Sequence, residues 1–227
     1  MNRPGTDGAR GPARANDALA ASMVRRQIEG RGIADPRLLE AMRCIPRHRF
    51  VPSAGLEEAY GDFPLPIGHG QTISQPYIVA VMTDALALRG SERVLEVGTG
   101  SGYQTAVLAE LAARVYSIER IPELAAAARK ALLSLGYDNV RFAVGDGCEG
   151  WPARAPFDRI LVAAAAPAVP PALAAQLADN GIMVIPIGDS RFSQDLVVVR
   201  RIGGSLEQER SIGCRFVPLI GKDGFEG

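Results

Sequence analysis

The stretch Arg93-Val94-Leu95-Glu96-Val97-Gly98-Thr99-Gly100-Ser101-Gly102 reads as a buried strand that runs directly into a glycine-rich turn. Its glycines let the backbone turn sharply and approach a ligand closely, because no Cβ atom stands in the way. The next apolar run ends at Glu119, and the one after it, residues 140–144, is followed by Gly145-Asp146-Gly147. Together these features indicate a site for a nucleotide-type cofactor.

The spacing of the glycines separates two kinds of cofactor. A dinucleotide fingerprint, G-x-G-x-x-G, needs its third glycine at position 103, where this chain has Tyr103. The spacing here is G-x-G-x-G. Glycine-rich turns between a strand and a helix are also common in proteins that bind no cofactor there, so the turn alone leaves a purely structural interpretation open. Glu119 and Asp146, each following a strand, favour the cofactor.

Strand-like and helical segments alternate through the second half of the chain. We expect strands near 93–97, 114–118, 140–144, 157–163, 182–186 and 195–201, with helices between the first five. The segment Pro122 to Leu135 is the clearest helix, with Pro at N1 and Gly136 as its stop. This alternation predicts an α/β fold with a doubly wound, mostly parallel sheet that binds ligands at the carboxyl ends of its strands.

The N-terminal part is expected to form a helical cap on that fold. Residues 1–16 are rich in Pro, Gly and Arg and are predicted to be disordered. Apolar spacing predicts a helix over 18–28, and Asp35-Pro36 is an N-cap that starts another through about Ile45. The proline- and glycine-rich residues 46–76 cannot form regular helix or a central strand. We expect one domain over 17–227, with 17–76 as helices and loop and 77–227 as the α/β core.

Composition limits the classes of protein and partner. The chain has 227 residues, 47% hydrophobic and 22% charged, which suits one globular domain. Lys+Arg and Asp+Glu both number 25, so no global positive field attracts nucleic acid or anionic lipid. Cys44, Cys148 and Cys214 are scattered, which predicts reduced thiols in a cytoplasmic protein and no zinc cluster. No apolar run reaches membrane length, and a monomer is the default expectation.

The irregular segment resembles the signature of a known family. Its sequence is Ala59-Tyr60-x-Asp62-x-Pro64-Leu65-Pro66-Ile67-Gly68-x-Gly70-Gln71-Thr72-Ile73-Ser74-Gln75-Pro76-Tyr77. This stretch, called the signature loop below, resembles that of the protein-L-isoaspartate O-methyltransferases, which are class I S-adenosylmethionine-dependent enzymes. The agreement continues through 96–102, 145–147, 155–158, 164–170 and 215–219, and it covers roughly residues 22 to 220.

This resemblance implies a Rossmann-like fold, a cofactor and a set of binding residues. The cofactor would be S-adenosylmethionine, its product S-adenosylhomocysteine, and no metal is expected. Glu119 would bond both ribose hydroxyls, since a carboxylate can accept two hydrogen bonds at once. Asp146 would meet the adenine amino group. The implied cofactor-binding residues are Thr72, Ile73, Glu96, Gly98, Thr99, Gly100, Gly102, Glu119, Asp146 and Gly147.

The resemblance also implies a protein-repair activity, with Ser74 as the active-site residue. The methyl group would go to the free α-carboxylate of L-isoaspartyl residues in damaged proteins and peptides, and the ester would then close to a succinimide. With a pKa of about 4, this acceptor is anionic at neutral pH, so no general base is needed. Ser74 would orient the carboxylate by a hydrogen bond, and in-line positioning would supply most of the catalysis.

Several of these residues also have simpler structural interpretations. Ser74 stands two places before Pro76 and is a good N-cap candidate for the helix that follows. The segment 145–147 could be a tight turn closed by a local Asx bond. Asp62 either orders the signature loop or is a surface acid. The triplet Arg47-His48-Arg49 is interpreted as a solvated basic turn, and no chemistry is assigned to His48 or His69.

Two other functions stay open at this point. A class I methyltransferase acting on a small molecule or nucleic acid would share the cofactor motifs. However, the chain has Ala165-Ala166-Pro167 where amino-directed nucleic-acid methyltransferases carry Asn/Asp-Pro-Pro-Tyr. A non-enzymatic adaptor on the same fold would bind the cofactor without turnover.

Overall fold

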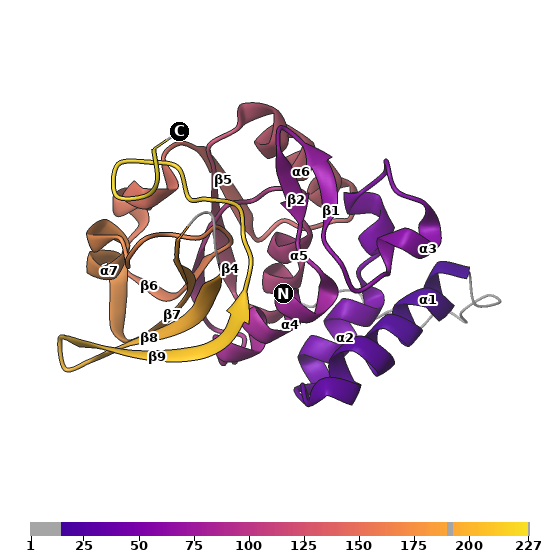
Figure 1. The fold of residues 1–227 in the computed structure, drawn as a ribbon, viewed down its shortest axis with the longest axis horizontal. Coiled ribbons are helices and arrows are strands. Elements are labelled where there is room, and N and C mark those ends of the chain that lie inside the picture. The colour runs from indigo at the N-terminus through magenta and orange to yellow at the C-terminus, as the bar shows by residue number, and fades with distance from the viewer. Residues whose placement is uncertain (1–14, 190–192, 227) are drawn as a thin grey trace.

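A seven-stranded sheet forms the centre of the molecule (Figure 1), in a computed structural model that describes residues 15–189 and 193–226. The strand order is β5-β4-β3-β6-β7-β8-β9. The strands are β3 (Arg93–Val97), β4 (Arg114–Glu119), β5 (Val140–Val144), β6 (Phe157–Val162), β7 (Leu177–Gly188), β8 (Gln194–Ile202) and β9 (Ser205–Cys214). The first five run parallel and the last two antiparallel, so the predicted doubly wound, mostly parallel sheet is confirmed.

Both faces of the sheet are buried, which explains the near-continuous apolar runs in its central strands. Successive side chains of a strand point to opposite faces. Val94 and Leu161 therefore belong to one hydrophobic core, while Leu95 and Ile160 belong to the other. The strands are held from both sides, and their carboxyl ends become a fixed platform.

Longer helices cover one face and short ones the other. The first face carries α4 (Pro76–Ala85), α5 (Tyr103–Leu111) and α6 (Pro122–Ser134), and the second carries α7 (Pro171–Gln176). The prediction of a helix between the third and fourth core strands is wrong. Two 3-10 turns, Gly147–Glu149 and Pro152–Arg154, lie there instead, because closely spaced glycines and prolines interrupt any longer helix.

The predicted N-terminal helices lie beside α4 and α5 at one end of the molecule (Figure 1). They are α1 (Ala15–Met23), continued by a π-helical turn over Val24–Ile28, then α2 (Pro36–Cys44) and the short α3 (Leu56–Ala59). The extension expected to be disordered, residues 1–16, lies outside the described residues except for Ala15 and Asn16, which begin α1.

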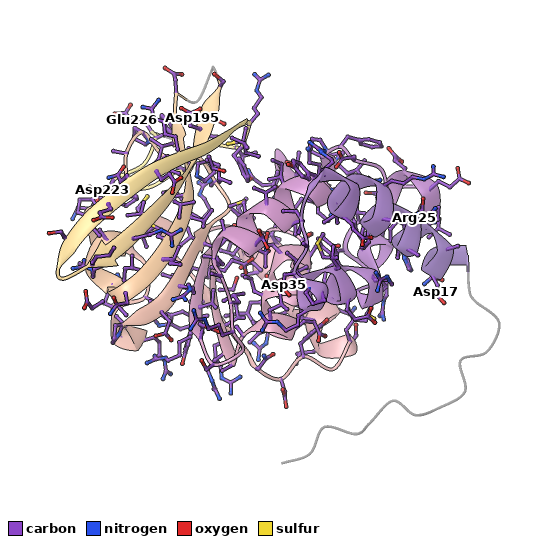
Figure 2. All side chains as sticks on the ribbon, turned by 90° about the horizontal axis from the view of Figure 1, so that it is seen from below. Asp17, Arg25, Asp35, Asp195, Asp223 and Glu226 are labelled. Carbon is purple, nitrogen blue, oxygen red and sulfur yellow. The ribbon has the colours of Figure 1, made fainter. Side chains whose placement is uncertain are left out.

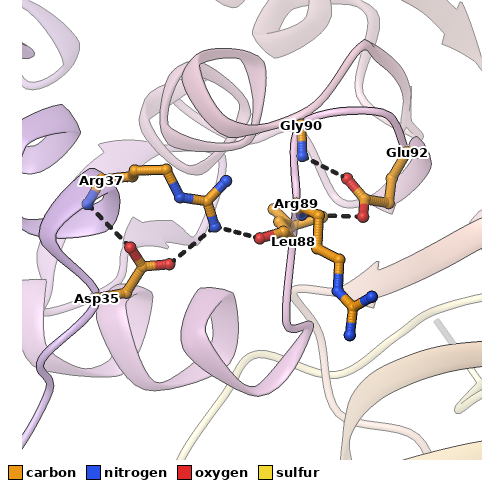
Figure 3. Close-up of polar contacts among 6 residues, drawn as sticks. All are labelled: Asp35, Arg37, Leu88, Arg89, Gly90 and Glu92. Carbon is orange, nitrogen blue, oxygen red and sulfur yellow. Dashed lines mark hydrogen bonds and ion pairs between the residues drawn. The ribbon is translucent and has the colours of Figure 1, made fainter.

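A network of polar contacts fixes the N-terminal helices to the core (Figure 3). Asp35 caps α2 as predicted, because its Oδ1 accepts a hydrogen bond of 2.9 Å from the Arg37 N–H. The Arg37 guanidinium also donates to the Leu88 carbonyl, beyond the end of α4. The Glu92 carboxylate accepts from the N–H groups of residues 89 and 90 at 2.9 and 2.8 Å, which orders the loop that leads into β3.

The signature loop contains a small hairpin that the sequence did not predict. Strands β1 (Leu65–Gly68) and β2 (Gln71–Ile73) pair antiparallel in a sheet of their own, with Leu65 opposite Ile73. Both of these side chains are buried. Residues 68–70 adopt positive φ at the turn. The hairpin thereby presents the end of β2 to the carboxyl edge of the main sheet.

Charged groups lie at both ends of the molecule. Figure 2 shows Asp17 and Arg25 on the N-terminal helices and Asp195, Asp223 and Glu226 at the opposite end. This arrangement agrees with the equal numbers of acidic and basic residues, 25 each. Within residues 15–189 and 193–226, no helix is long and apolar enough to cross a membrane.

Candidate active site

The glycine turn lies where the strand order of the sheet reverses. Strand β3 is flanked by β4 on one side and β6 on the other. The Gly98 N–H donates to the Ile118 carbonyl at 2.8 Å, and the Ala163 N–H donates to the Val97 carbonyl at 2.8 Å. The carboxyl ends of three strands therefore meet at this turn. Open α/β sheets bind their ligands at such a reversal.

Each glycine of the turn adopts a backbone conformation that other residues rarely tolerate. The φ angles are +92° at Gly98, +53° at Gly100 and +89° at Gly102. Gly102 has a packing role as well, since an added Cβ atom would lie 3.1 Å from the Cβ atom of Ala128 in α6. All three positions therefore have a backbone conformation that favours glycine, as the sequence indicated.

Glu119 closes the turn from the neighbouring strand. Its carboxylate accepts hydrogen bonds from the Gly100 N–H at 2.9 Å and the Ile121 N–H at 3.0 Å. The residue is only 6% exposed, yet it lines the pocket above the sheet. A carboxylate offers about four lone-pair sites, so each oxygen can accept one further hydrogen bond from a ligand hydroxyl.

A pocket opens directly over the glycine turn. Segments that are far apart in the sequence, between residues 71 and 220, build the walls of this cavity, called the donor pocket below. The lining residues are Gln71, Thr72, Ile73, Ser74, Val79, Met82, Val97, Gly98, Thr99, Gly100, Ser101, Tyr103, Gln104, Ile118, Glu119, Arg120, Gly147, Ala163, Ala164, Phe216, Val217, Pro218, Leu219 and Ile220.

A second groove adjoins the donor pocket and shares a wall with it. This acceptor groove is lined by Pro64, Thr72, Ser74, Gln75, Ile78, Ala163, Gly213, Arg215, Phe216 and Val217. Thr72, Ser74, Ala163, Phe216 and Val217 line both cavities. The one charged residue of the groove is Arg215, which is exposed and has no ion-pair partner among the described residues. The groove therefore suits an anionic ligand.

Eight of the predicted site residues lie together in the donor pocket. Thr72, Ile73, Ser74, Gly98, Thr99, Gly100, Glu119 and Gly147 line it. The other three, Glu96, Gly102 and Asp146, do not. Gly102 packs against α6, as described above, and the other two make hydrogen bonds around the pocket.

Glu96 lies behind the glycine turn and is completely buried. Its Oε2 accepts hydrogen bonds of 2.6 Å from the hydroxyls of Thr105 and Ser117, while its Oε1 has no partner among the described residues. Burial raises the pKa of Glu96 to about 8, and the nearby charge of Glu119 adds to the rise. At neutral pH this carboxyl group is therefore largely protonated.

Asp146 makes the local Asx hydrogen bond that was the alternative interpretation of its turn. Its Oδ1 accepts from the Cys148 N–H at 2.8 Å. Its Oδ2 accepts from the Lys222 N–H at 2.9 Å, in the segment that follows β9. Both carboxylate oxygens thus bind backbone groups, and one of them joins the centre of the chain to its C-terminal segment.

The N-cap interpretation of Ser74 is wrong. The N-cap of α4 is Gln75, and no side chain caps this helix. The Ser74 hydroxyl is left available at the wall between the two cavities. Asp62 does order the signature loop, since its carboxylate accepts from the Tyr77 N–H at 3.3 Å and from Arg31 at 2.8 Å.

The interpretation of Arg47-His48-Arg49 as a solvated turn is also wrong. Arg47 is completely buried, and His48 is partly buried with its Nδ1 2.9 Å from the Tyr60 hydroxyl. Only Arg49 is exposed. A basic triplet looks solvated on average, and the sequence signal that pointed inward was the apolar pair Phe50-Val51 next to it.

No group of three His, Cys, Asp or Glu side chains in the described part of the chain could hold a metal ion. No disulfide bond joins any of the three cysteines, all of which lie within the described residues.

Comparison with known proteins gives consistent matches over nearly the whole chain. The sequence model of the protein-L-isoaspartate(D-aspartate) O-methyltransferase (PCMT) family matches residues 18–224. A protein-L-isoaspartate O-methyltransferase of Trichlorobacter lovleyi is 58% identical over 211 residues, which is 92% of this chain and 97% of the relative. Another, from Methanoregula boonei, is 55% identical over 90% of this chain and 94% of the relative.

Solved structures agree in fold. A protein-L-isoaspartate O-methyltransferase structure superposes with a TM-score of 0.80 at 27% identity, covering 91% of this chain and 66% of that one. A Plasmodium falciparum structure named as a β-aspartate methyltransferase, in complex with S-adenosyl-L-homocysteine, has a TM-score of 0.77 at 26% identity. The match covers 88% of this chain and 98% of that one.

Proposed function

The chain belongs to the protein-L-isoaspartate(D-aspartate) O-methyltransferase family, and on that premise we propose how its residues carry out the family's reaction. It is an S-adenosylmethionine-dependent enzyme that methylates the free α-carboxylate of L-isoaspartyl residues in proteins and peptides. The alternatives that the cofactor motifs left open, an enzyme for small molecules or nucleic acid and a non-enzymatic adaptor, gain no specific support from the site.

The donor pocket has the chemistry that the cofactor requires. Glu119 offers free lone pairs for the ribose hydroxyls at the end of β4, beside a turn without side chains at Gly98 and Gly100. Thr72, Ile73, Thr99 and Gly147 complete the contact surface. Glu96, Gly102 and Asp146 act from outside, by holding the turn and the C-terminal segment in place.

One arrangement carries the proposal for catalysis: Ser74 lines the donor pocket and the acceptor groove at once. When bound, S-adenosylmethionine supplies a methyl group activated by a positively charged sulfur. Ser74 donates its hydroxyl hydrogen bond to one oxygen of the substrate carboxylate and aims the other oxygen at that methyl group. No side chain has to remove a proton, because the acceptor is already anionic.

The acceptor groove supports an acidic peptide as the substrate. Arg215 is its single charge, and a guanidinium is suited to carboxylates in planar, paired hydrogen bonds. Val217 to Leu219 shape the adjacent wall. We further propose that the enzyme works as a monomer in the cytoplasm on isoaspartyl proteins and peptides, without nucleic acid. The balanced charge and the lack of disulfide bonds among the three cysteines support this view.

Paired peptides test the proposal. The enzyme is incubated with labelled S-adenosylmethionine and with isoaspartyl and normal aspartyl peptides of the same sequence. Label is expected in the isoaspartyl peptide only, and equal or absent labelling of both would count against the assignment.

Ser74→Ala tests the role of the serine in the same assay. A hydrogen bond to a charged group contributes about 1.5–3 kcal/mol, so turnover should fall roughly 10- to 100-fold. Affinity for S-adenosylhomocysteine, measured by calorimetry, should stay within about twofold of wild type. A fully active variant would remove Ser74 from the mechanism.

A further inference from the structure

Arg47 is a buried cation directly behind Ser74. Its side chain is 0% exposed. Its Nε donates a hydrogen bond of 2.8 Å to the Ala59 carbonyl, and its Nη2 donates one of 2.8 Å to the Ser74 carbonyl. Ala59 opens the signature loop and Ser74 follows its hairpin. A single guanidinium therefore joins the two sides of this loop.

The same guanidinium contacts the turn that forms the donor pocket. Its central carbon lies 4.7 Å from the centre of the Tyr103 ring, within the range of a cation–π interaction. Tyr103 is fully buried, follows Gly102 as the first residue of α5, and lines the donor pocket. Arg47 thus links the loop that carries Ser74 to the element that begins at the glycine turn.

The charge of Arg47 forms no ion pair in the described part of the chain, although the Asp62 carboxylate interacts with it at longer range. No carboxylate of the described residues lies within ion-pair distance, and Nη1 has no hydrogen-bond partner among them. Burying an unpaired charge costs several kcal/mol, and an apolar side chain of similar size often serves stability as well or better. Desolvation lowers the pKa of Arg47, with Tyr103 opposing it, yet a guanidinium stays protonated in a protein. Stability alone does not explain this residue.

We propose that Arg47 is a positioning residue for methyl transfer, which fixes the peptide unit of Ser74 and thereby the direction of its hydroxyl. The inference rests on the proposed role of Ser74.

A double-mutant cycle tests this coupling. The ratio kcat/KM for an isoaspartyl peptide is measured for wild type, Arg47→Met, Ser74→Ala and the double variant. Arg47→Met should lower kcat/KM about tenfold or more in the wild-type background, the size expected when a charge-assisted hydrogen bond is lost. In the Ser74→Ala background it should cost less than about twofold, since residues that act through one another are not additive.

Two outcomes would contradict the inference, and they differ from failure of the proposed function. Equal losses in both backgrounds would make Arg47 merely structural, while Ser74 kept its role. A fully active Ser74→Ala would remove the serine itself. The affinity of the four proteins for the isoaspartyl peptide can also be measured in the presence of S-adenosylhomocysteine. This binding cycle needs no turnover, so it can be completed even if the variants have very low activity.

Further variants separate positioning from folding. Arg47→Lys keeps the charge but lacks the planar fork that reaches both carbonyls, so kcat/KM should fall several-fold. If Arg47→Met does not fold, Arg47→Lys replaces it in the double-mutant cycle with Ser74→Ala. A fully active Arg47→Lys would overturn the proposal. Arg49→Met is the matched control on the same turn, because Arg49 is exposed and its side chain donates a hydrogen bond to the Ser134 hydroxyl, away from Ser74. It should leave kcat/KM unchanged.

Discussion

Glu96 shows how a residue can serve the cofactor turn without reaching the pocket. Its carboxyl group accepts two hydroxyl hydrogen bonds, and the Ser117 hydroxyl also lies 2.6 Å from the Thr99 hydroxyl inside the turn. The chain of contacts therefore runs from a buried acid in β3 to a residue that lines the pocket. An apolar residue at position 96 would leave two buried hydroxyls without an acceptor.

Glu96 should make the stability of the enzyme depend on pH. Burial, with a contribution from Glu119, raises its pKa to about 8, whereas in the unfolded chain it is near 4.5. Between these values the folded state holds a proton that the unfolded state releases, so the free energy of unfolding falls as pH rises from about 5 to 9. When unfolding by denaturant is measured at several pH values, the free energy of unfolding should fall less with rising pH in Glu96→Gln than in wild type. Glu57→Gln, at an exposed position, should behave like wild type; equal slopes for all three would contradict the assignment.

The sequence identified most single residues of the site, and its errors have physical causes. Glycines with positive φ and an acid at the end of a strand leave a local signature, so Gly98, Gly100 and Glu119 could be found. Arg47 was missed because arginine is mostly exposed in proteins, and the apolar pair Phe50-Val51 beside it is a weak signal of burial. Its partners are carbonyls of Ala59 and Ser74, which only the folded loop brings within reach.

At the scale of elements, the C-terminal segment closes the donor pocket opposite the signature loop. The Ala165 N–H donates to the Val217 carbonyl at 2.8 Å, and the Leu219 N–H donates to the Ala165 carbonyl at 2.7 Å. The Asp146 carboxylate anchors the same segment at Lys222. Two backbone pairs and one carboxylate therefore hold residues 216–220 over the cofactor site.

Asp146→Ala should loosen this segment and weaken cofactor binding. Desolvation raises the pKa of Asp146, but the N–H donors of Lys222 and Cys148 outweigh it, so the net pKa is lowered and the anchor is charged at neutral pH. Loss of hydrogen bonds to a charged group should weaken S-adenosylhomocysteine affinity roughly tenfold, as measured by calorimetry. Asp138→Ala, at an exposed position on the loop that precedes β5, is the control. Unchanged affinity in Asp146→Ala would show that the backbone pairs suffice.

The sequence predicted elements well where they were long and periodic. Strands β3 and β5 have the expected bounds, and α6 differs by one residue. The β1–β2 hairpin was missed because its strands are short and contain proline and glycine, and β9 because exposed polar residues dominate it. Neither carries the apolar periodicity on which sequence prediction depends.

For the whole molecule, ligand binding should couple the signature loop to the C-terminal segment. The donor pocket takes its walls from residues 71–74 and from residues 216–220, on either side of the sheet edge. A ligand at 100 times its Kd stabilises the folded state by about 2.7 kcal/mol. For a chain of this size, that corresponds to a rise in Tm of roughly 5–10 °C.

Thermal unfolding with S-adenosylhomocysteine should show this rise, and an isoaspartyl peptide should add to it. The matched aspartyl peptide should add nothing. In Ser74→Ala the shift caused by S-adenosylhomocysteine should persist while the peptide's contribution shrinks. An equal shift from both peptides would mean that the groove does not distinguish the two linkages.

Strand β9 leaves one rim of the main sheet open along nearly its whole length. Unpaired amides and carbonyls on such a rim can template the addition of a foreign strand, the first step toward fibrils. The formal charge of the chain is zero, so overall repulsion gives no protection. That task falls to the local charges of Glu207, Glu209 and Arg210 on the rim itself. An enzyme whose substrates are damaged polypeptides must itself avoid aggregating with them, and charges at an exposed edge strand oppose such pairing.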